Sequence, residues 1–596
     1  MGYDAPFLAK PAATAEPVIF DGQFGWLHCP AREGAHAEVI VMCSALGVEM
    51  MCAHAGWRRL AEMFAEAGIP ALRFDYPGTG DSSGDDQEPD RVSAWLDGVD
   101  AAINWARRET GAPRATLIGL RFGALLAAHV AARRDDIAAI AALAPVVSGR
   151  AHMRELAALA QLTASSPEAT RPRSDAGDLI AGGFLFSAET QAAAKALDMR
   201  KLGAVRTRQA LLISRDSDAE NELARKWRAD GAHVELASFV GYDAFVSSPT
   251  TTRTPDEVWR RIVEWRASAP ADRTAGKQPT QDASIRANGS AEIVGDGWRE
   301  EPLQFGRDAR LFGILTRPAP AALAADETRP AIIILNAGRN HHIGWGRGAV
   351  EIARHLARRG ETVLRMDAAG VGDSPAWPDG PAEVLYAPEQ RDDLSAALDE
   401  LSQRGFARFF VVGACAGAYL ALHGALSDVR ISGFALVNLL RFHWGPDDDL
   451  DIAIGQQVYG PTSSYLARLT DGGTWKRLLS GDIAVAGIAG AMAQRGARAF
   501  VRVGARMLER FGLSDSETSE AARWMRQLDA RDVKMLLIYS TDDPGLAELE
   551  SYFGPGGRQL LAIGHARIAQ LPGADHNLSQ PAARQEAIRL IEDVLS

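Results

Sequence analysis

A cysteine between two glycines has the clearest capacity for chemistry in this sequence. Cys415 lies in the segment 413–417, GACAG, between a strand-like FVV and a helix-like AYLAL. A turn from strand to helix is so tight that only glycine fits beside a nucleophile, and it exposes that side chain at a helix N-terminus. The positive end of the helix favours a thiolate and an oxyanion alike. We predict that Cys415 is a nucleophile; the alternative is a buried core thiol.

The partners of such a nucleophile must follow in the order acid, then histidine. The strand-like MLLIYS (535–540) is followed by Asp542 and Asp543, and His576 precedes the final helix-like segment. We expect Cys415 to attack, His576 to move the proton and Asp543 to orient the imidazole, with Asp542 as the alternative acid. No CxxC pair or Cys/His ligand spacing is present, so we expect neither a metal nor a cofactor.

An oxyanion hole needs two backbone N–H groups. One is expected from Ala416, directly after the nucleophile, and the other from Ala337 or Gly338, in the turn after the strand-like AIIILN. We expect His341 and His342, a few residues further on, to rim the pocket and bind substrate. The alternative is that they are polar loop residues in water.

The first half of the chain repeats these motifs. D-x-x-G-x-G-D-S occurs at 75–82 and again at 367–374, an offset of 292 residues (367 − 75). A second elbow-like turn, GLRFG at 119–123, places Arg121 at an offset of 294 from Cys415 (415 − 121). The near-constant offset indicates a duplication. Strand-like and helix-like segments alternate in both halves, which predicts mostly parallel sheets flanked by helices.

A polar stretch divides the chain almost in half. Residues 268–291 are nearly free of large apolar side chains, which is typical of a linker. We therefore predict domains at 1–267 and 292–596. The offset between the halves grows after the elbow, so the second domain should carry a larger helical cap, at about 440–530. Its aromatic residues could hold an apolar acyl chain or fix the cap to the core; they are Phe442, Trp444, Tyr459, Tyr465 and Trp475.

The first domain lacks the nucleophile and the histidine that the proposed reaction of the second domain needs. Arg121 stands at the nucleophile position and cannot act as one, because it is permanently charged. The aligned acid is Asp218, and the aligned histidine position holds Ala244. We expect a degenerate domain in which Arg121 either binds a carboxylate or phosphate of the substrate or forms an ion pair, for example with Asp218.

Composition excludes several other classes of protein. The 596 residues have a net charge of −12, which argues against non-specific nucleic-acid binding. We find no run of 18 or more apolar residues, so we expect no membrane span, and the first residues do not resemble a secretory signal. Four cysteines in so long a chain fit a reducing cytoplasm. A homodimer is compatible with the sequence.

These motifs resemble the α/β-hydrolase superfamily, in its serine aminopeptidase-like branch. The halves are also similar to two hydrolase-like proteins that accompany exosortase and exopolysaccharide gene clusters in Gram-negative bacteria. One type has arginine at the elbow; the other has cysteine there and an N-A-G-x-x-H-H/R-x-G segment, matched at 336–344. Ala416 stands where that type commonly has serine, and Trp345 where it has proline. The resemblance implies two tandem α/β-hydrolase domains, each with a helical cap insertion, and says little about substrate.

Together these observations predict an acyl hydrolase or acyltransferase that acts on a small-molecule or carrier-bound ester or thioester through a covalent Cys415 acyl-enzyme. A dienelactone-type lactone hydrolase, which also uses a cysteine triad, is one alternative. A non-catalytic binding module is another, because the first half shows that this lineage tolerates loss of chemistry.

Overall fold

The computed structural model describes residues 13–31, 36–163, 177–203, 207, 209–268, 292–320, 329–381, 383–445, 448, 450 and 517–596. Contacts between Cα atoms divide the chain into two compact units, with the boundary at Pro302. That boundary falls inside the strand β12 (Trp298–Phe305), which hydrogen-bonds within the second sheet together with β11 (Ile293–Gly295). We therefore assign both strands to the second domain. Nearly all of the predicted linker and most of the predicted cap lie outside the described residues.

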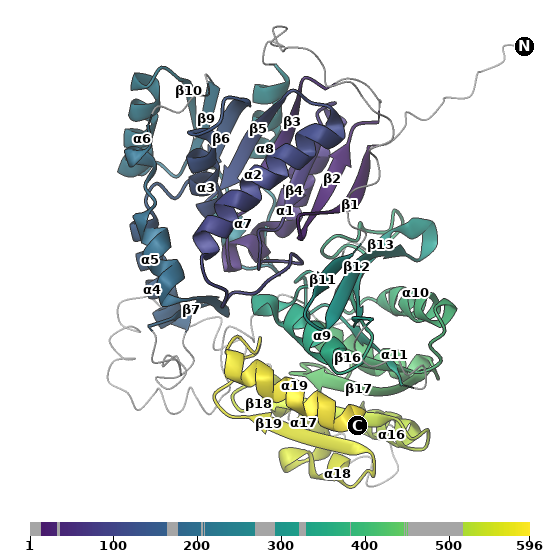
Figure 1. The fold of residues 1–596 in the computed structure, drawn as a ribbon. Helices are drawn as coiled ribbons and strands as arrows, with labels where there is room; N and C mark the ends of the chain where they lie inside the picture. Colours follow the sequence, from purple (N-terminus) through teal and green to yellow (C-terminus); the bar gives the residue numbers. More distant parts are fainter. Residues whose placement is uncertain are drawn as a thin grey trace, which may run out of the picture. The chain divides into compact units, whose positions relative to one another are not determined.

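The first domain is built on an eight-stranded sheet in the order β1-β2-β4-β3-β5-β6-β9-β10 (Figure 1). Its strands are β1 (Thr14–Phe20), β2 (Gln23–Cys29), β3 (Glu38–Cys43), β4 (Ala71–Phe74), β5 (Arg114–Leu120), β6 (Ile137–Leu143), β9 (Gln209–Ser214) and β10 (His233–Ser238). The pairs β1–β2 and β2–β4 are antiparallel, and the remaining pairs are parallel. The carboxyl ends of the parallel strands thus share one edge. A separate hairpin joins β7 (Leu179–Ala181) to β8 (Phe184–Phe186).

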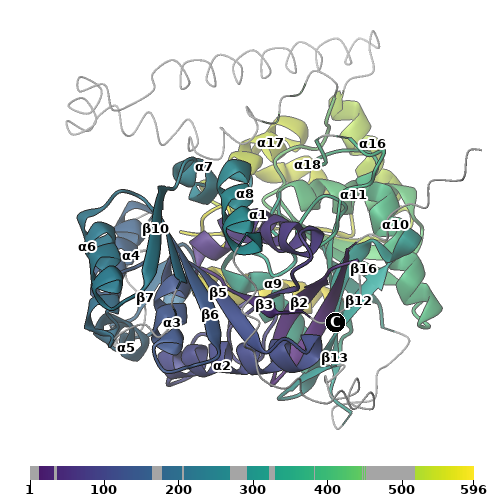
Figure 2. The ribbon, with the colours of Figure 1, turned by 90° about the horizontal axis from the view of Figure 1, so that it is seen from above.

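Helices cover both faces of this sheet. The helices α1 (Val48–Glu66) and α8 (Asp256–Ala267) lie on one face, and α2 (Arg91–Thr110) and α3 (Phe122–Ala131) on the other (Figure 2). The others are α4 (Gly149–Thr163), α5 (Ala188–Ala196), α6 (Asp218–Ala229) and α7 (Tyr242–Val246). In α1 the buried Trp57, Leu60, Ala61 and Phe64 recur at the spacing of one helix face, which is why this segment packs as an amphipathic helix.

The second domain is built on a nine-stranded sheet in the order β11-β12-β13-β15-β14-β16-β17-β18-β19. Its further strands are β13 (Leu311–Pro318), β14 (Ala331–Ile334), β15 (Val363–Asp367), β16 (Phe409–Ala414), β17 (Ile431–Val437), β18 (Lys534–Ser540) and β19 (Ala566–Leu571). All pairs from β15 to β19 are parallel. Among the described residues, its helices are α9 (Gly348–Arg358), α10 (Gln390–Gln403), α11 (Ala416–Ser427), α16 (Glu517–Asp529), α17 (Pro544–Phe553), α18 (Arg558–Leu561) and α19 (Pro581–Leu595).

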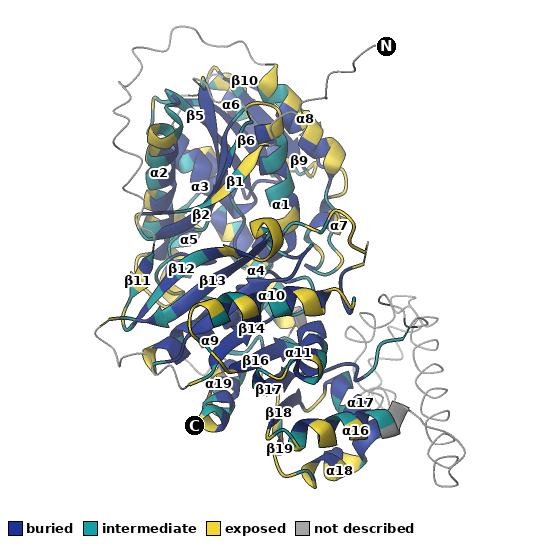
Figure 3. Cartoon of the chain, turned by 90° about the vertical axis from the view of Figure 1, so that its right-hand side faces the viewer, coloured by how far each residue is buried: buried dark blue, intermediate teal, exposed yellow. Residues whose placement is uncertain are grey.

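Alternate residues of the central strands enter two separate cores. Ile333 and Val411 pack in the cluster formed with α10 and α11, whereas Ile332 and Val412 pack with α9 and α19. Side chains of a strand point alternately to its two faces, so a sheet covered on both faces needs apolar residues at every position. Figure 3 shows these strands buried, with the exposed residues concentrated on the outer sides of the helices.

This architecture confirms the predicted fold class of two mixed, mostly parallel sheets flanked by helices. Among the described helices, none combines the length and apolar character that a membrane crossing requires.

Candidate active site

Cys415 occupies a sharp turn between β16 and α11. Its backbone has φ 55° and ψ −118°, a conformation that a non-glycine residue rarely adopts. Its N–H donates to the carbonyl of Val437 at 3.0 Å. A Cβ added at Gly417 would lie 2.3 Å from the carbonyl oxygen of Asn336, and one at Gly413 would lie 2.1 Å from that of Gly417. The turn therefore has no room for a side chain at either glycine, and the strained residue stands at a helix N-terminus.

His576 and Asp543 meet on the loops that follow β19 and β18. The Nδ1 atom of His576 lies 2.5 Å from Oδ2 of Asp543. Asp543 is buried and also caps α17 by accepting the N–H of Gly545 at 2.7 Å. Asp542 is exposed. Of the two candidate acids, Asp543 is thus the one that contacts the imidazole.

Asp543 also governs the charge of the imidazole. Burial disfavours the protonated ring, but the adjacent carboxylate outweighs burial and raises the pKa of His576 well above its usual value. The Cys415 thiol contributes to the same rise, although Nε2 of His576 is buried and makes no hydrogen bond of good geometry with any described residue. Contacts of this kind are often long without substrate and shorten when it binds.

Asn438 binds the backbone of His576, and this role was not predicted from the sequence. It directly follows β17, and its Nδ2 donates to the carbonyl of His576 at 2.8 Å and to Oγ of Ser540 at 3.1 Å. Its Oδ1 accepts the N–H of Ser540 at 2.8 Å. One feature of the sequence could have indicated this role. Asn438 follows β17, which lies in the sheet between β16, the strand before Cys415, and β18, the strand before Asp543.

The two segments expected to form the oxyanion hole, at Ala416 and at Ala337–Gly338, lie close to one another. Ala416 is the first residue of α11, and Ala337 and Gly338 follow β14, with φ 60° at Gly338. The close approach of the Asn336 carbonyl to Gly417 brings the two segments together. The arrangement is compatible with a pair of N–H donors beside Cys415.

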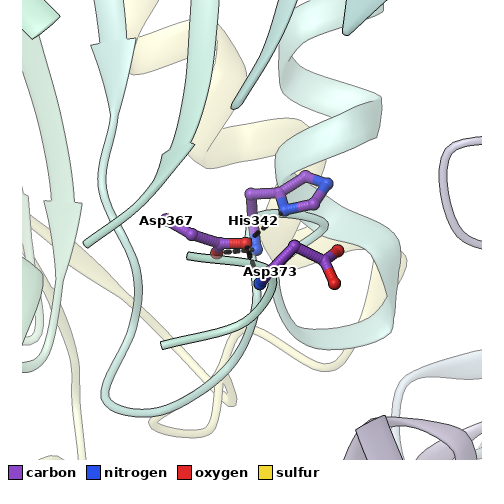
Figure 4. Close-up of side chains that lie close together, drawn as sticks. All are labelled: His342, Asp367 and Asp373. Carbon is purple, nitrogen blue, oxygen red and sulfur yellow. Dashed lines mark hydrogen bonds and ion pairs between the residues drawn. The ribbon is translucent and has the colours of Figure 1, made fainter. Parts of the chain in front are cut away.

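His341 and His342 lie in the segment between β14 and α9. Both are buried, and their rings lie edge to face with centroids 5.7 Å apart. His342 donates its N–H to Oδ1 of Asp367 at 2.8 Å, and its Nδ1 lies 2.7 Å from Oδ2 of the same carboxylate (Figure 4). These contacts hold His342 against a buried carboxylate, and the expectation that the two histidines rim the pocket and bind substrate stays a prediction.

His342, Asp367 and Asp373 together have the side-chain types of a cation site, with candidate ligand atoms within 4.8 Å of one another. The oxygens of Asp367 are already engaged, however. In addition to the two contacts of His342, Asp367 accepts Nδ2 of Asn336 at 2.7 Å and the N–H of Asp373 at 2.8 Å. Four donors fill the acceptor positions of one carboxylate. We therefore assign Asp367 to holding the loop, and the Asp373 carboxylate points away from it (Figure 4).

The D-x-x-G-x-G-D-S motif has the same structural role in both domains. Oγ of Ser374 donates to the carbonyl of Asp367 and accepts the N–H of Phe312, at 2.7 and 2.9 Å. In the first domain Oγ of Ser82 makes the matching bonds to Asp75 and Phe24, also at 2.7 and 2.9 Å. The motif thus joins the turn after a parallel strand to a strand on the antiparallel side of the sheet.

Arg121 has the same backbone conformation as Cys415 but no nucleophilic side chain. Its φ of 52° and ψ of −116° match those of Cys415. Its guanidinium donates to Glu49 at 2.7 Å, to Glu155 at 2.6 Å and to the carbonyl of Ala144 at 3.3 Å. Burial opposes its charge, but the glutamates outweigh burial and raise the pKa of Arg121. The side chain is therefore a buried ion-pair partner.

The alignment of the acid in the first domain needs correction. Ser217 lies three residues after the end of β9 and caps α6, as Asp543 lies three residues after the end of β18 and caps α17. Asp218 is the next residue and is exposed, and Ala244 is exposed in α7. The acids on Arg121 are Glu49 and Glu155 rather than Asp218, because α1 and α4 carry them to the elbow.

Known families match both parts of the chain. The family described as Serine aminopeptidase, S33, matches residues 45–229, and the Alpha/beta hydrolase family matches residues 332–587. The chain consists of two tandem α/β-hydrolase domains. No curated protein matches it.

Solved structures resemble single domains of this chain. Est1E from Butyrivibrio proteoclasticus, with ferulic acid bound, is 17% identical with a TM-score of 0.33, over 42% of this chain and 98% of that one. An esterase from Pyrococcus furiosus is 15% identical with a TM-score of 0.31, over 45% and 95%. These similarities concern the fold alone and carry no argument about substrate.

Proposed function

We propose that the second domain is a cysteine-dependent acyl hydrolase or acyltransferase that acts on an ester or thioester through an acyl-enzyme on Cys415. One observation carries the proposal. A cysteine occupies a strained elbow at a helix N-terminus, in a domain where a partly buried histidine lies 2.5 Å from a buried carboxylate. The motif resemblance to the cysteine-elbow hydrolase-like proteins of exopolysaccharide systems agrees with it.

In the first half-reaction, the proton of the Cys415 thiol passes to Nε2 of His576, and Sγ bonds to the acyl carbon. The carbonyl electron pair moves onto oxygen, where the N–H of Ala416 and that of Ala337 or Gly338 would bind the negative charge. Collapse of this intermediate breaks the bond to the leaving alcohol or thiol, which takes the proton from His576. Asp543 stabilises the imidazolium that exists between these steps.

In the second half-reaction, water or another acceptor attacks the Cys415 thioester. His576 takes the proton of the acceptor and returns it to Sγ as the thioester breaks, so the free enzyme is restored. Water gives a hydrolase, and an alcohol or amine gives a transferase. The same residues serve both outcomes.

The test is a screen of acyl-CoA, acyl-carrier and aryl esters with the wild type, Cys415→Ala and, as a matched control, Cys29→Ala. Removing the nucleophile should lower turnover at least about 10³-fold, and Cys29→Ala should retain it. Cys415→Ser should be weaker than the wild type, because a hydroxyl is harder to deprotonate than a thiol.

Mass spectrometry should detect an acyl adduct on Cys415 of the wild type. A binding module would bind esters without forming that adduct. Measurable turnover by a folded Cys415→Ala variant, or acylation at another residue, would contradict the proposal.

A further inference from the structure

Tyr386, in the loop before α10, has an unusual backbone for so large a residue. Its φ is 63°, in the left-handed region, where a bulky side chain is strained. Such strain persists only where the surroundings impose it, and it is concentrated at functional sites. The side chain is buried in an apolar cluster with Val371, Val384 and Ala416. Ala416 directly follows Cys415, so Tyr386 packs against the elbow.

Two other aromatic rings fix the ring of Tyr386. The Trp444 ring stacks on it with centroids 4.1 Å apart and planes within 5°. The Tyr419 ring meets it edge to face at 5.1 Å. Aromatic contacts of both kinds are stabilising beyond the area that they bury. A ring held in this way presents its hydroxyl in one direction.

The phenol of Tyr386 lies among charged and ionisable groups. Burial, and then the proximity of Cys415, raise the pKa of Tyr386 well above its usual value, while Arg441 acts in the opposite direction. Arg441 is itself buried and lies 3.8 Å from the carboxylate of Glu548. At neutral pH the phenol therefore keeps its proton, and a protonated phenol can donate a hydrogen bond.

We propose that Tyr386 is a further catalytic group, whose hydroxyl donates a hydrogen bond to the acyl oxygen as negative charge develops there during attack by Cys415. The proton stays on the phenol throughout, so the hydroxyl only stabilises charge. It would add a side-chain donor to the two backbone donors of the expected oxyanion hole. This inference rests on the proposed function.

The test compares Tyr386→Phe with Tyr419→Phe, which removes a neighbouring phenol in the same aromatic group. Phenylalanine preserves the stacking on Trp444, so the variant should fold. Acetylation of Cys415 by p-nitrophenyl acetate should be about 10²-fold slower in Tyr386→Phe and unchanged in Tyr419→Phe. Alkylation of Cys415 by iodoacetamide should be unchanged in both, because that reaction forms no oxyanion.

Two results would overturn the inference itself. Wild-type acetylation rates in Tyr386→Phe would show that the hydroxyl has no role. An equal slowing of acetylation and alkylation would show that it acts on the thiolate or the fold. Failure of wild-type Cys415 to be acetylated would instead overturn the proposed function, so the two failures are distinguishable.

Discussion

Asp542 and Asp543 are adjacent in sequence and differ completely in surroundings. Asp543 is buried, caps a helix and contacts His576, whereas Asp542 is exposed. Sequence could rank them only by their distance from the end of the strand. The contact of Asp543 with His576 agrees with this ranking, because strand ends and helix caps are locally encoded, and the role of Asp543 as the catalytic acid stays a prediction.

Exchanging each aspartate for asparagine tests this distinction. Asp543→Asn removes the charge that raises the pKa of His576, and its amide permits the wrong imidazole tautomer. We expect ester turnover to fall at least about 10²-fold, and His576 to lose its proton at lower pH, because burial then acts unopposed. Asp542→Asn should resemble the wild type. Kinetics and an NMR titration of the imidazole would measure both effects, and equal effects of the two substitutions would contradict the assignment.

At the scale of elements, the turns at Arg121 and Cys415 have the same backbone conformation, but their side chains differ in chemistry. Glycine spacing between a strand and a helix sufficed to predict both turns. The partners of Arg121 could not be predicted in this way, because Glu49 and Glu155 lie 72 and 34 residues away along the chain. Contacts between separate helices depend on packing that no local pattern encodes. The buried contact of His342 with Asp367, 25 residues away, escaped prediction for the same reason.

Arg121→Ala should destabilise the first domain and spare turnover. The loss should be about 2 kcal/mol at neutral pH, below that of a fully buried pair because Glu155 is half exposed and screened. The pKa of Glu155 is lowered to about 2, first by His152, whose Nδ1 lies 3.8 Å from its carboxylate, and then by Arg121. A depressed carboxyl pKa contributes stability above the unfolded value, about 4.3, and this contribution disappears as pH falls toward 2.

The difference in stability between the wild type and Arg121→Ala should accordingly shrink over that acidic range. Chemical denaturation at several pH values would measure it, with ester kinetics at neutral pH as the companion readout. Unchanged stability with weakened substrate binding would instead favour anion recognition by Arg121.

At the scale of the whole molecule, the duplication can be recognised from the sequence, because the hydrophobic periodicity and the glycine turns of the first half recur in the second half at a near-constant offset. The structure moves the acid position of the first domain by one residue, from Asp218 to Ser217, because Ser217 lies three residues after β9 as Asp543 lies three residues after β18. In the first domain Arg121 and Ser217 now stand where the second has Cys415 and Asp543. One chain therefore carries two copies of the fold and, in our proposal, one active site.

That asymmetry predicts selective labelling of one thiol among four. Burial raises the pKa of Cys43 and of Cys52 to about 12, and burial together with Glu16 raises that of Cys29. Thiolates, not thiols, react with iodoacetamide, so these three should react more slowly than Cys415 near neutral pH. Cys415 lies at a helix N-terminus with His576 available to take its proton, and it should be alkylated first.

Intact-mass and peptide analysis of the native protein should thus find one adduct, at Cys415, whereas the denatured chain should take up four. His576→Ala should slow the native reaction and require more alkaline solution, because the thiol then has no imidazole to accept its proton. Faster labelling of Cys29 than of Cys415, or labelling indifferent to His576, would contradict the proposal that a single thiol of this tandem protein is activated.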